Sequence, residues 1–515
     1  MNAISKNQLK SWADLFVKIY ISVVLLYQTL WQIVPVRVVM CNAHLDIISP
    51  AMAVLGFAFL AADILIERTV IKSRYCVLLV ATIVIMCASS LFYVSYGWTE
   101  NAKVIVWQVV HMFLIYSFYL RLAKEHMELF LRNLFLVISA IFTVAVVVSI
   151  YQFIMQISYI TPVEGGNSRQ GFQGGRLFGV FGYLYYATLL ALLLGVGAVY
   201  GAVKAKRIWV RILFIIQAAL FFIYLVLSGT RSTLVGLLCG MAVFTIIAVR
   251  NIIANKKTGA SKVVRGLGAV AAAVLCVVIL YGAYSGTHMV LSKVPVLLGT
   301  QDSDNSGNAN DSDNDDITGT IIDDVLERPD TQTGDISNNR FRIWRDYFLC
   351  GGSSVKTMLF GFSPSYMSII KEQFPDIYIV QYSKEHYPLS YEIGRIYDTH
   401  NGYLAIYSSI GLLGFVTMAA FLICVLITAI KYFVKNKRPD SMAILIFTML
   451  SIIAVTTFFD SDIFFKCTSA SIIFWLLIGC MMKYAQPLQN SSDNAFNEKA
   501  LSKKVEQSEE TLPQV

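Results

Sequence analysis

The sequence Tyr397-Asp-Thr-His400-Asn-Gly-Tyr-Leu404 lies where a long polar segment ends and a strongly apolar run begins. The apolar run extends from Gly402 to about Ile430, which is long enough to cross a lipid bilayer. The junction therefore places an imidazole, an amide and a carboxylate at the mouth of a predicted membrane helix. A lone histidine at such a boundary is usually a solvated end residue, so its role depends on which other side chains reach the same side.

The composition identifies an integral membrane protein. Of the 515 residues, 56% are hydrophobic and 14% are charged, whereas soluble domains carry roughly 25% charged residues. The net charge of +8 comes from basic residues dispersed over short loops, which argues against a nucleic-acid partner. The nine cysteines show no Cys-x-x-Cys pair and no metal-ligand spacing, so no metal ion or other cofactor is expected. Only Cys41 and Cys350 look exposed on the outer side, where a disulfide is conceivable but unsupported.

Apolar runs predict about twelve transmembrane helices, and therefore an all-α polytopic membrane protein. The runs lie at residues 14–35, 47–66, 75–96, 103–120, 133–157, 177–200, 209–228, 232–250, 265–284, 402–430, 441–458 and 464–482. Basic residues precede the first run and follow every second one, as the positive-inside rule requires if both termini are cytoplasmic. The other loops then face outward, and two are substantial: a Gly-rich loop at about 158–176 and a long one at about 285–400.

The pattern divides the chain into five parts. Residues 1–170 hold helices one to five and an outer loop, and residues 171–284 hold helices six to nine with arginine motifs. Residues 285–400 form one large extracytoplasmic loop, with an acidic part at 300–335 that we expect to be disordered and a helical cap at 336–400. Residues 401–484 hold the last three helices, and 485–515 form a disordered cytoplasmic tail.

The acidic part of the long loop contains one metal-like motif. Residues 311–315 open like an EF-hand calcium loop, but Asp316 and Ile322 occupy the positions of its glycine and its closing glutamate. The mismatch favours a solvated acidic linker.

Five arginines are expected at the outer edge of the membrane: Arg176, Arg231, Arg340, Arg342 and Arg345. Taken singly, each is more often a snorkelling or salt-bridging residue. Arginine is disfavoured on the outer side, however, so several at membrane-edge positions indicate a bound anion. Guanidinium groups suit phosphate oxygens because they donate two parallel hydrogen bonds.

Three of these arginines surround a predicted amphipathic helix that carries Phe341, Trp344, Tyr347 and Phe348 at helical spacing. Such rings can anchor a cap at headgroup depth or stack on sugar faces, and anchoring is the more common role of any single ring.

An arginine cluster at headgroup level suggests a pyrophosphate-linked lipid, and the nearby His400 suggests a general base. Together they predict transfer of a group from the lipid carrier to a hydroxyl that His400 deprotonates. Pyrophosphate is a weak base, so its departure needs charge neutralisation more than protonation, and arginines can supply that without a divalent metal. Asp398 is a candidate to orient the imidazole through a loop geometry.

On these residues the chain resembles the O-antigen ligase and Wzy-type polysaccharide polymerase superfamily of bacterial membrane glycosyltransferases. The resemblance covers roughly residues 170–425 and rests on Arg176-Leu-Phe-Gly179, Ser228-Gly-Thr-Arg231-Ser232, Arg340-Phe-Arg342-Ile-Trp344, Leu359-Phe-Gly361, His400-Asn401-Gly-Tyr-Leu404 and Gly411-Leu-Leu-Gly414. It implies metal-independent, inverting transfer of an undecaprenyl-pyrophosphate-linked glycan to a sugar hydroxyl. The chain has Gly182-Tyr-Leu-Tyr185 where the family often has an Asn-Pro-Asn-like turn, which leaves the role of the Arg176 motif open.

The resemblance and the charge pattern together give a set of predicted site residues. Catalytic roles are predicted for His400, Arg231 and Arg340, and substrate-binding roles for Arg176, Arg342, Asn401, Trp344 and Asp398.

The leading hypothesis is a polymerase or ligase of O-antigen or capsular polysaccharide in the bacterial cytoplasmic (inner) membrane, with the polymerase slightly favoured. Its partners would be the undecaprenyl-pyrophosphate-linked oligosaccharide, membrane lipid and other polysaccharide-assembly proteins. A secondary transporter or lipid-linked glycan flippase would suit about twelve helices, but the two halves show no repeat and no matching Gly/Pro-broken helices. A membrane sensor or structural partner would tolerate substitution of Arg231 and His400.

Other conspicuous residues have structural explanations. Gly411 and Gly414 have the spacing that permits close helix packing. His111 is an intramembrane ionisable group near a predicted helix end, where snorkelling is an adequate account. Asp460 and Asp462 are expected in a solvated turn of the last outer loop, with contact to an acceptor sugar as the less favoured alternative.

Overall fold

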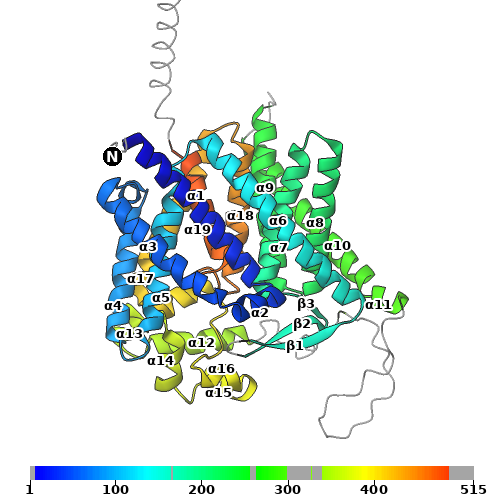
Figure 1. The fold of residues 1–515 in the computed structure, drawn as a ribbon. Coiled ribbons are helices and arrows are strands. Elements are labelled where there is room, and N and C mark those ends of the chain that lie inside the picture. The colour runs from blue at the N-terminus through cyan, green and yellow to red at the C-terminus, as the bar shows by residue number, and fades with distance from the viewer. Residues whose placement is uncertain (1–5, 164–165, 256–261, 299–325, 327–338, 487–515) are drawn as a thin grey trace, which may run out of the picture.

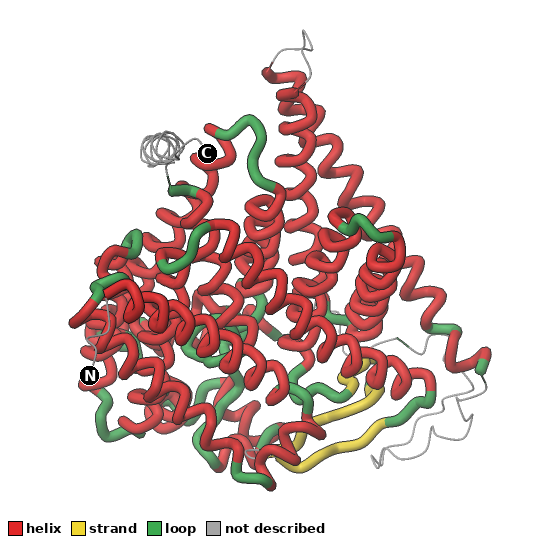
Figure 2. Tube along the Cα trace, turned by 45° about the horizontal axis from the view of Figure 1, so that its top comes forward, coloured by secondary structure: helices red, strands yellow, loops and turns green. Residues whose placement is uncertain are grey.

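The computed structural model describes residues 6–163, 166–255, 262–298, 326 and 339–486. Its helices form a bundle, and short helices cap one end of that bundle (Figures 1 and 2). The chain enters the bundle through α1 at the end opposite to the cap (Figure 1). The acidic part predicted at 300–335, with its calcium-like motif, lies outside the described residues apart from Leu326, and so does the predicted tail beyond residue 486.

Each of the twelve predicted apolar runs falls on an apolar helix. Within the described residues, nine helices are long and apolar enough to cross a membrane, and three apolar helices, α4, α18 and α19, are shorter. The helices are α1 (Lys6–Trp31), α3 (Ile48–Ile66), α4 (Cys76–Phe92), α5 (Trp98–Val109) with its continuation η3 (Val110–Ile115) and η4 (Phe118–Leu120), α6 (Lys124–Ile154), α7 (Leu184–Lys204), α8 (Ile208–Ser228), α9 (Arg231–Asn255), α10 (Lys262–Leu291), α17 (Gly402–Lys435), α18 (Ser441–Thr457) and α19 (Ser469–Tyr484). The expectation of an all-α polytopic membrane protein is confirmed.

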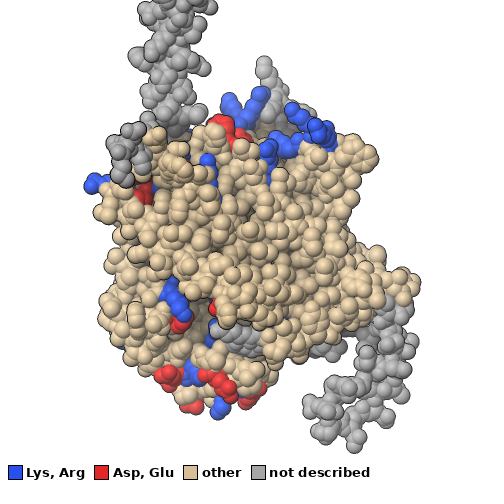
Figure 3. All heavy atoms as spheres, in the orientation of Figure 1, with Lys and Arg blue, Asp and Glu red and all other residues tan. Residues whose placement is uncertain are grey.

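The distribution of charge over the surface is that of a membrane protein. On the face shown in Figure 3, the middle of the bundle is nearly free of charged residues. Lys and Arg gather at the end where α1 begins, and acidic and basic residues mix at the cap. An apolar belt between two charged ends is what a bilayer requires.

A small antiparallel sheet lies at the cap end, where the sequence indicated only a Gly-rich loop. Its strands β1 (Ser158–Val163), β2 (Gly166–Gln173) and β3 (Arg176–Gly179) pair in the order β1-β2-β3, with Ser158 opposite Gly171 and Gln173 opposite Arg176 (Figure 1). Glycine and polar residues are depleted in strands, so no alternating pattern marks these strands in the sequence. The helix α2 (Val34–Asn42) and the 3₁₀ turn η1 (Leu45–Ile47) complete this end near the start of the chain.

The cap consists of α12 (Arg340–Gly351), α13 (Val355–Phe360), α14 (Tyr366–Gln373), α15 (Tyr378–His386) and α16 (Pro388–Glu392). It has a hydrophobic core of its own, which includes Ile343, Tyr347, Phe362 and Ile369. The predicted amphipathic helix is α12, but only part of its aromatic set faces inward: Tyr347 is buried, whereas Phe341 and Phe348 are exposed. The long helix α10 and the short helix α11 (Val294–Leu297) precede the acidic part of the chain.

The helix α17 is broken at Gly411, whose φ of 65° and ψ of −168° are not helical. The main chain of Leu359 and Phe360 fills the break, because a methyl group on Gly411 would lie 2.4 Å from their backbone atoms. The freed carbonyl groups are satisfied: the Phe362 N–H donates to Ser408 O at 2.8 Å and the Ser89 hydroxyl to Ser409 O at 3.0 Å. The expected explanation for Gly411, packing of an unbroken helix, is therefore wrong.

Two further expectations are corrected by burial. All nine cysteines lie among the described residues and are free, and Cys350 is buried whereas Cys41 is exposed, so the conceivable disulfide does not form.

His111 is fully buried in the π-helical turn η3, where its ring stacks on Trp107 at a centroid distance of 5.7 Å. It does not snorkel to an interface.

Candidate active site

His400 lies in the short link between the cap and α17. Its φ of 44° is in the left-handed region, and Thr399 and Asn401 on either side of it are buried. The Asn401 side chain caps α17, because its Oδ1 accepts the N–H groups of Tyr403 and Leu404 at 3.0 Å each. The cap holds the first turn of α17 in place and fixes the point where the chain turns past His400.

The imidazole of His400 is partly buried and partly open. Its ring lies 4.8 Å from the Tyr397 ring, and its Nδ1 is buried and has no hydrogen-bond partner among the described residues. Burial lowers the pKa of His400 below its ordinary 6.5; Arg340 and Lys466 lower this pKa further, while the carboxyl groups of Asp398 and Asp462 oppose the shift. The ring is therefore neutral at pH 7, as a general base must be.

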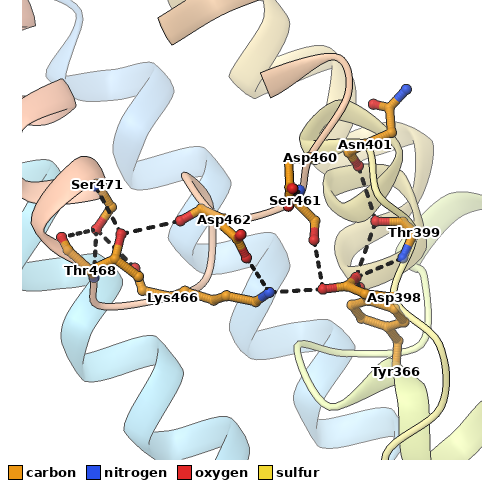
Figure 4. A network of polar contacts seen from close by, with 10 residues as sticks. All are labelled: Tyr366, Asp398, Thr399, Asn401, Asp460, Ser461, Asp462, Lys466, Thr468 and Ser471. Atoms are coloured by element: carbon orange, nitrogen blue, oxygen red, sulfur yellow. Dashed lines mark hydrogen bonds and ion pairs between the residues drawn. The ribbon is translucent and has the colours of Figure 1, made fainter. Parts of the chain in front are cut away.

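Asp398 does not orient that imidazole through a hydrogen bond, because its two carboxylate oxygens bond to other groups (Figure 4). Its Oδ1 accepts from the Tyr366 hydroxyl at 2.8 Å and from the Thr399 N–H at 2.7 Å. Its Oδ2 accepts from the Ser461 hydroxyl at 2.6 Å and from the Lys466 ammonium group at 2.8 Å. Burial alone would raise the pKa of Asp398, but Lys466, His400 and the hydrogen bonds hold it well below its usual range. Asp398 is thus a charged anchor for the loop that carries His400.

Lys466 joins two parts of the chain at this point. Its Nζ contacts Asp398 and also Asp462 Oδ1 at 2.5 Å, and the Asp462 side chain is fully buried. The predicted span at 464–482 placed Lys466 inside the membrane, whereas α19 begins only at Ser469. Thr468 and Ser471 form a capping box at the start of α19, where the loop from α18 ends. Burial opposes the ammonium charge, yet the two carboxylates raise the pKa of Lys466 well above its ordinary value.

Asp460 and Asp462 are not in a solvated turn. Both are buried, with 4% and 0% of their surface exposed, and both lie beside Lys466 in the view of Figure 4. Burial, together with the neighbouring Asp462, raises the pKa of Asp460 well above its ordinary value.

Arg340 is the arginine that the structure brings to His400. It opens α12, and its guanidinium carbon lies 5.9 Å from the centre of the Phe459 ring in the loop between α18 and α19. Trp344, one turn later, donates from Nε1 to Thr399 O at 2.9 Å and lies edge-on to Phe458. The helix α12 therefore contacts both loops of the site, and Trp344 fixes the residue that precedes His400.

The surroundings of His400 and Arg340 form one corner of the cap end of the bundle. Arg176 and Arg231 lie at a second corner of the same end. Arg176, on β3, donates from Nε to Ser228 O at 3.1 Å, at the end of α8. Arg231 opens α9 and is exposed. The two corners are connected because α9 packs closely on α18: a methyl group on Gly236 would lie 2.5 Å from the Thr456 side chain, close to where α18 ends.

Arg342 and Arg345 are engaged within the cap. The Arg342 guanidinium carbon lies 3.7 Å from the centre of the Tyr378 ring, and Arg345 is 3.7 Å from the Asp346 carboxylate. Both arginines are exposed. Across the described ranges, no three His, Cys, Asp or Glu side chains are grouped in a way that could hold a metal ion.

Sequence reasoning missed Lys466, Ser461 and Tyr366. Ser461 and Tyr366 carry no signal of their own, since both residue types are common in loops and caps. Lys466 did carry one: it is a single charge within an apolar run, four residues after Asp462, and an ionisable residue in such a run is a candidate for function.

Residues 216–419 match the family model described as O-antigen ligase. The matched segment includes Arg231, Arg340 and His400 and excludes Arg176 and Lys466. No curated protein matches the chain. The resemblance to the O-antigen ligase and Wzy-type polymerase superfamily is confirmed, and with it an enzyme of the glycosyl-transfer type.

Proposed function

We propose that this protein transfers an undecaprenyl-pyrophosphate-linked glycan to a sugar hydroxyl on the outer face of the bacterial cytoplasmic membrane, in the synthesis of a cell-surface polysaccharide. The observation that carries this proposal is a neutral, half-buried imidazole at the cap end of the bundle, in the electrostatic field of Arg340. The same end holds Arg176 and Arg231, so cationic groups and a base occur together where a lipid headgroup would lie.

In the proposed reaction, the acceptor hydroxyl oxygen attacks the anomeric carbon of the donor sugar as its proton passes to His400. The bond between that carbon and the pyrophosphate oxygen breaks, and its electron pair leaves with the pyrophosphate. Attack opposite to the leaving group inverts the anomeric configuration. Arg340 and Arg231 would stabilise the charge that develops on the departing pyrophosphate, which is the part of the reaction that needs the most help.

The residues around His400 support its role as the base beside the arginines. Asp398 and Lys466 keep the His400 loop in one place, and their opposite charges act in opposite directions on the pKa of the imidazole. A base with a pKa below 6.5 gives up its proton readily after each transfer. Trp344 and Asn401 hold the two sides of the same loop through contacts with the main chain.

The polymerase and the ligase differ in the acceptor, which is another lipid-linked repeat for the former and a lipid A-core sugar or a protein for the latter. We slightly favour the polymerase. Supplying the purified protein with a lipid-linked repeat as both donor and acceptor distinguishes the two, because only a polymerase lengthens it.

A transporter or flippase is the alternative, and the broken helix α17 is a structural feature in its favour. Broken helices in transporters expose carbonyl groups to a cavity. In α17 the main chain of residues 359–361 fills the break, and hydrogen bonds from Phe362 and Ser89 satisfy the freed carbonyls. The break is therefore a packing site for the cap and does not favour transport.

The test uses purified protein with a synthetic undecaprenyl-pyrophosphate oligosaccharide and an oligosaccharide acceptor, with and without EDTA. We expect the wild type to transfer the glycan in both conditions and His400→Ala to lose transfer, by about 10²–10⁴-fold as for other general bases. His386→Ala is the matched control, because His386 lies in the cap and bonds only to Tyr382 of its own helix. Full activity of His400→Ala, or movement of the lipid across the bilayer without transfer, would refute the proposal.

A further inference from the structure

A large cavity lies at the end of the bundle opposite to His400. It has a volume of about 930 Å³ and lies between α6, α7, α8, α18 and α19. Its wall is mainly apolar and includes Phe135, Leu194, Leu445 and Leu476. Lys204 lines the cavity and is the last residue of α7. The cavity therefore lies at the end of the bundle where α7 ends.

Two glycines of α7 allow aromatic rings to pack closely in the wall of this cavity. Gly197 lies against the Phe135 ring, and Gly201 lies against the Phe214 ring. Protein interiors are normally packed to near-crystalline density, and sites of roughly 300–1,000 Å³ are typical of bound ligands. The cavity is therefore large enough to hold a hydrocarbon chain.

The rim of the cavity is charged. Lys124 forms ion pairs with Asp440 at 2.7 Å and Glu128 at 4.0 Å, and Glu128 also accepts from the Tyr484 hydroxyl. Arg132 and Lys204 line the same cavity and are exposed. In the part of the chain that the structure describes, neither is ion-paired with a carboxylate. Two cationic groups, together with the exposed carboxylate of Glu125, thus stand beside an apolar space at the basic end of the bundle.

We propose that this cavity binds one glycerophospholipid from the leaflet at the basic end of the bundle. An acyl chain would fill the apolar space between α6, α7 and α18, and the phosphodiester group would lie between Arg132 and Lys204. Guanidinium and ammonium groups recognise phosphate oxygens by charge-assisted hydrogen bonds, and apolar walls bind the chain through the hydrophobic effect. The site is independent of glycan transfer, since it lies at the other end of the molecule.

The proposal is tested by native mass spectrometry of the full chain, delipidated in detergent and titrated with phosphatidylglycerol. We expect one tightly bound phosphatidylglycerol per protein. The double substitution Arg132→Ala/Lys204→Ala should weaken its binding by at least about tenfold, the effect expected from losing charge-assisted hydrogen bonds. Val210→Trp should also weaken it, because Val210 lines the cavity and is partly exposed, so the larger ring enters the space without disturbing the core.

Lys206→Ala is the control, because Lys206 is an exposed cation two residues beyond Lys204 and does not line the cavity. We expect it to bind phosphatidylglycerol as the wild type does. Equal loss with the control, or no change in any variant, would mean that the lipid binds the general surface and would overturn the proposal. A polyprenyl phosphate that co-purifies and is lost with the same double substitution would also overturn it, because the site would then belong to the carrier lipid.

Discussion

The Nζ of Lys466 lies 2.8 Å from Oδ2 of Asp398, although the two residues are 68 positions apart in the chain. The contact ties the loop between α18 and α19 to the loop that carries His400. Asp398 lies inside the segment that matches the O-antigen ligase family and Lys466 lies beyond it, so the candidate site extends past the matched segment. Substitutions at Lys466 should consequently behave like substitutions in the site.

The first prediction concerns pH. A base must be unprotonated, and the pKa of His400 is shifted below 6.5 by burial and by Arg340 and Lys466. Transfer activity should therefore be constant around pH 7 and fall only as the pH drops below about 6.5. The initial rate of transfer, measured between about pH 5 and pH 8, checks this, and a decline that begins well above pH 7 would contradict it.

The two partners of the Lys466–Asp398 pair should shift that pH profile in opposite directions. Asp398 raises the pKa of His400 and Lys466 lowers it. Asp398→Asn should move the acidic limb of the profile to lower pH, and Lys466→Met should move it to higher pH. Lys466→Arg keeps the charge and should leave the limb in place. If the role of the pair were only structural, both substitutions would reduce the amount of folded protein and leave the limb unmoved.

Loss of Arg340 should be severe. Removing a group that stabilises transition-state charge typically lowers kcat by about 10²–10³-fold, and we expect Arg340→Ala to fall in this range. Arg345→Ala is the control on the same helix, because Arg345 is exposed and lies near only Asp346. The comparison uses transfer rates of the two purified variants; similar losses in both would mean that α12 contributes general positive charge.

Arg231 provides a test of the second corner. Arg231→Ala should shorten the polysaccharide made by cells that depend on this protein, because the leaving pyrophosphate loses part of its charge compensation. Arg169→Ala should not, since Arg169 is an exposed residue on β2 with no place in the predicted motifs. Polymer length on a gel checks this. Normal length with Arg231→Ala would favour a sensor or an assembly partner.

The break in α17 predicts a strict requirement for glycine. Gly411→Ala would put a methyl group 2.4 Å from the main chain of Leu359 and Phe360, at a φ that side chains rarely adopt. The backbone conformation alone should cost about 1–3 kcal/mol, and the contact adds to this cost. The thermal midpoint of the purified protein should fall clearly. In Gly352→Ala, the added methyl group meets only ordinary contacts of its own helix, so the midpoint should remain near that of the wild type.

The helices that the bilayer requires to be apolar could be predicted from the sequence. All twelve apolar runs correspond to helices, because a long apolar stretch has few alternatives in a membrane. The link at His400 was also found, since it marks the change from polar to apolar sequence. These features depend on composition over many residues, which a single sequence records well.

Features that depend on long-range contacts were not found. Asp460 and Asp462 look like a solvated turn because nothing local shows that Lys466 lies between Asp462 and Asp398. The sheet β1-β2-β3 was missed because its pairing is satisfied by main-chain hydrogen bonds that glycine and polar residues can form equally well. The break at Gly411 was read as close helix packing because the segment that fills it, residues 359–361, comes from the cap.

The exposure of the cysteines allows the orientation of the protein in the membrane to be tested. Cys41, on α2 at the cap end, is the one cysteine that is exposed, and the other eight are buried or half-buried. A maleimide that does not cross membranes would therefore modify intact cells at Cys41 if the cap end faces outward, without any engineered residue. Protection of Cys41 in whole cells, followed by labelling after the membrane is opened, would instead place the cap end inside.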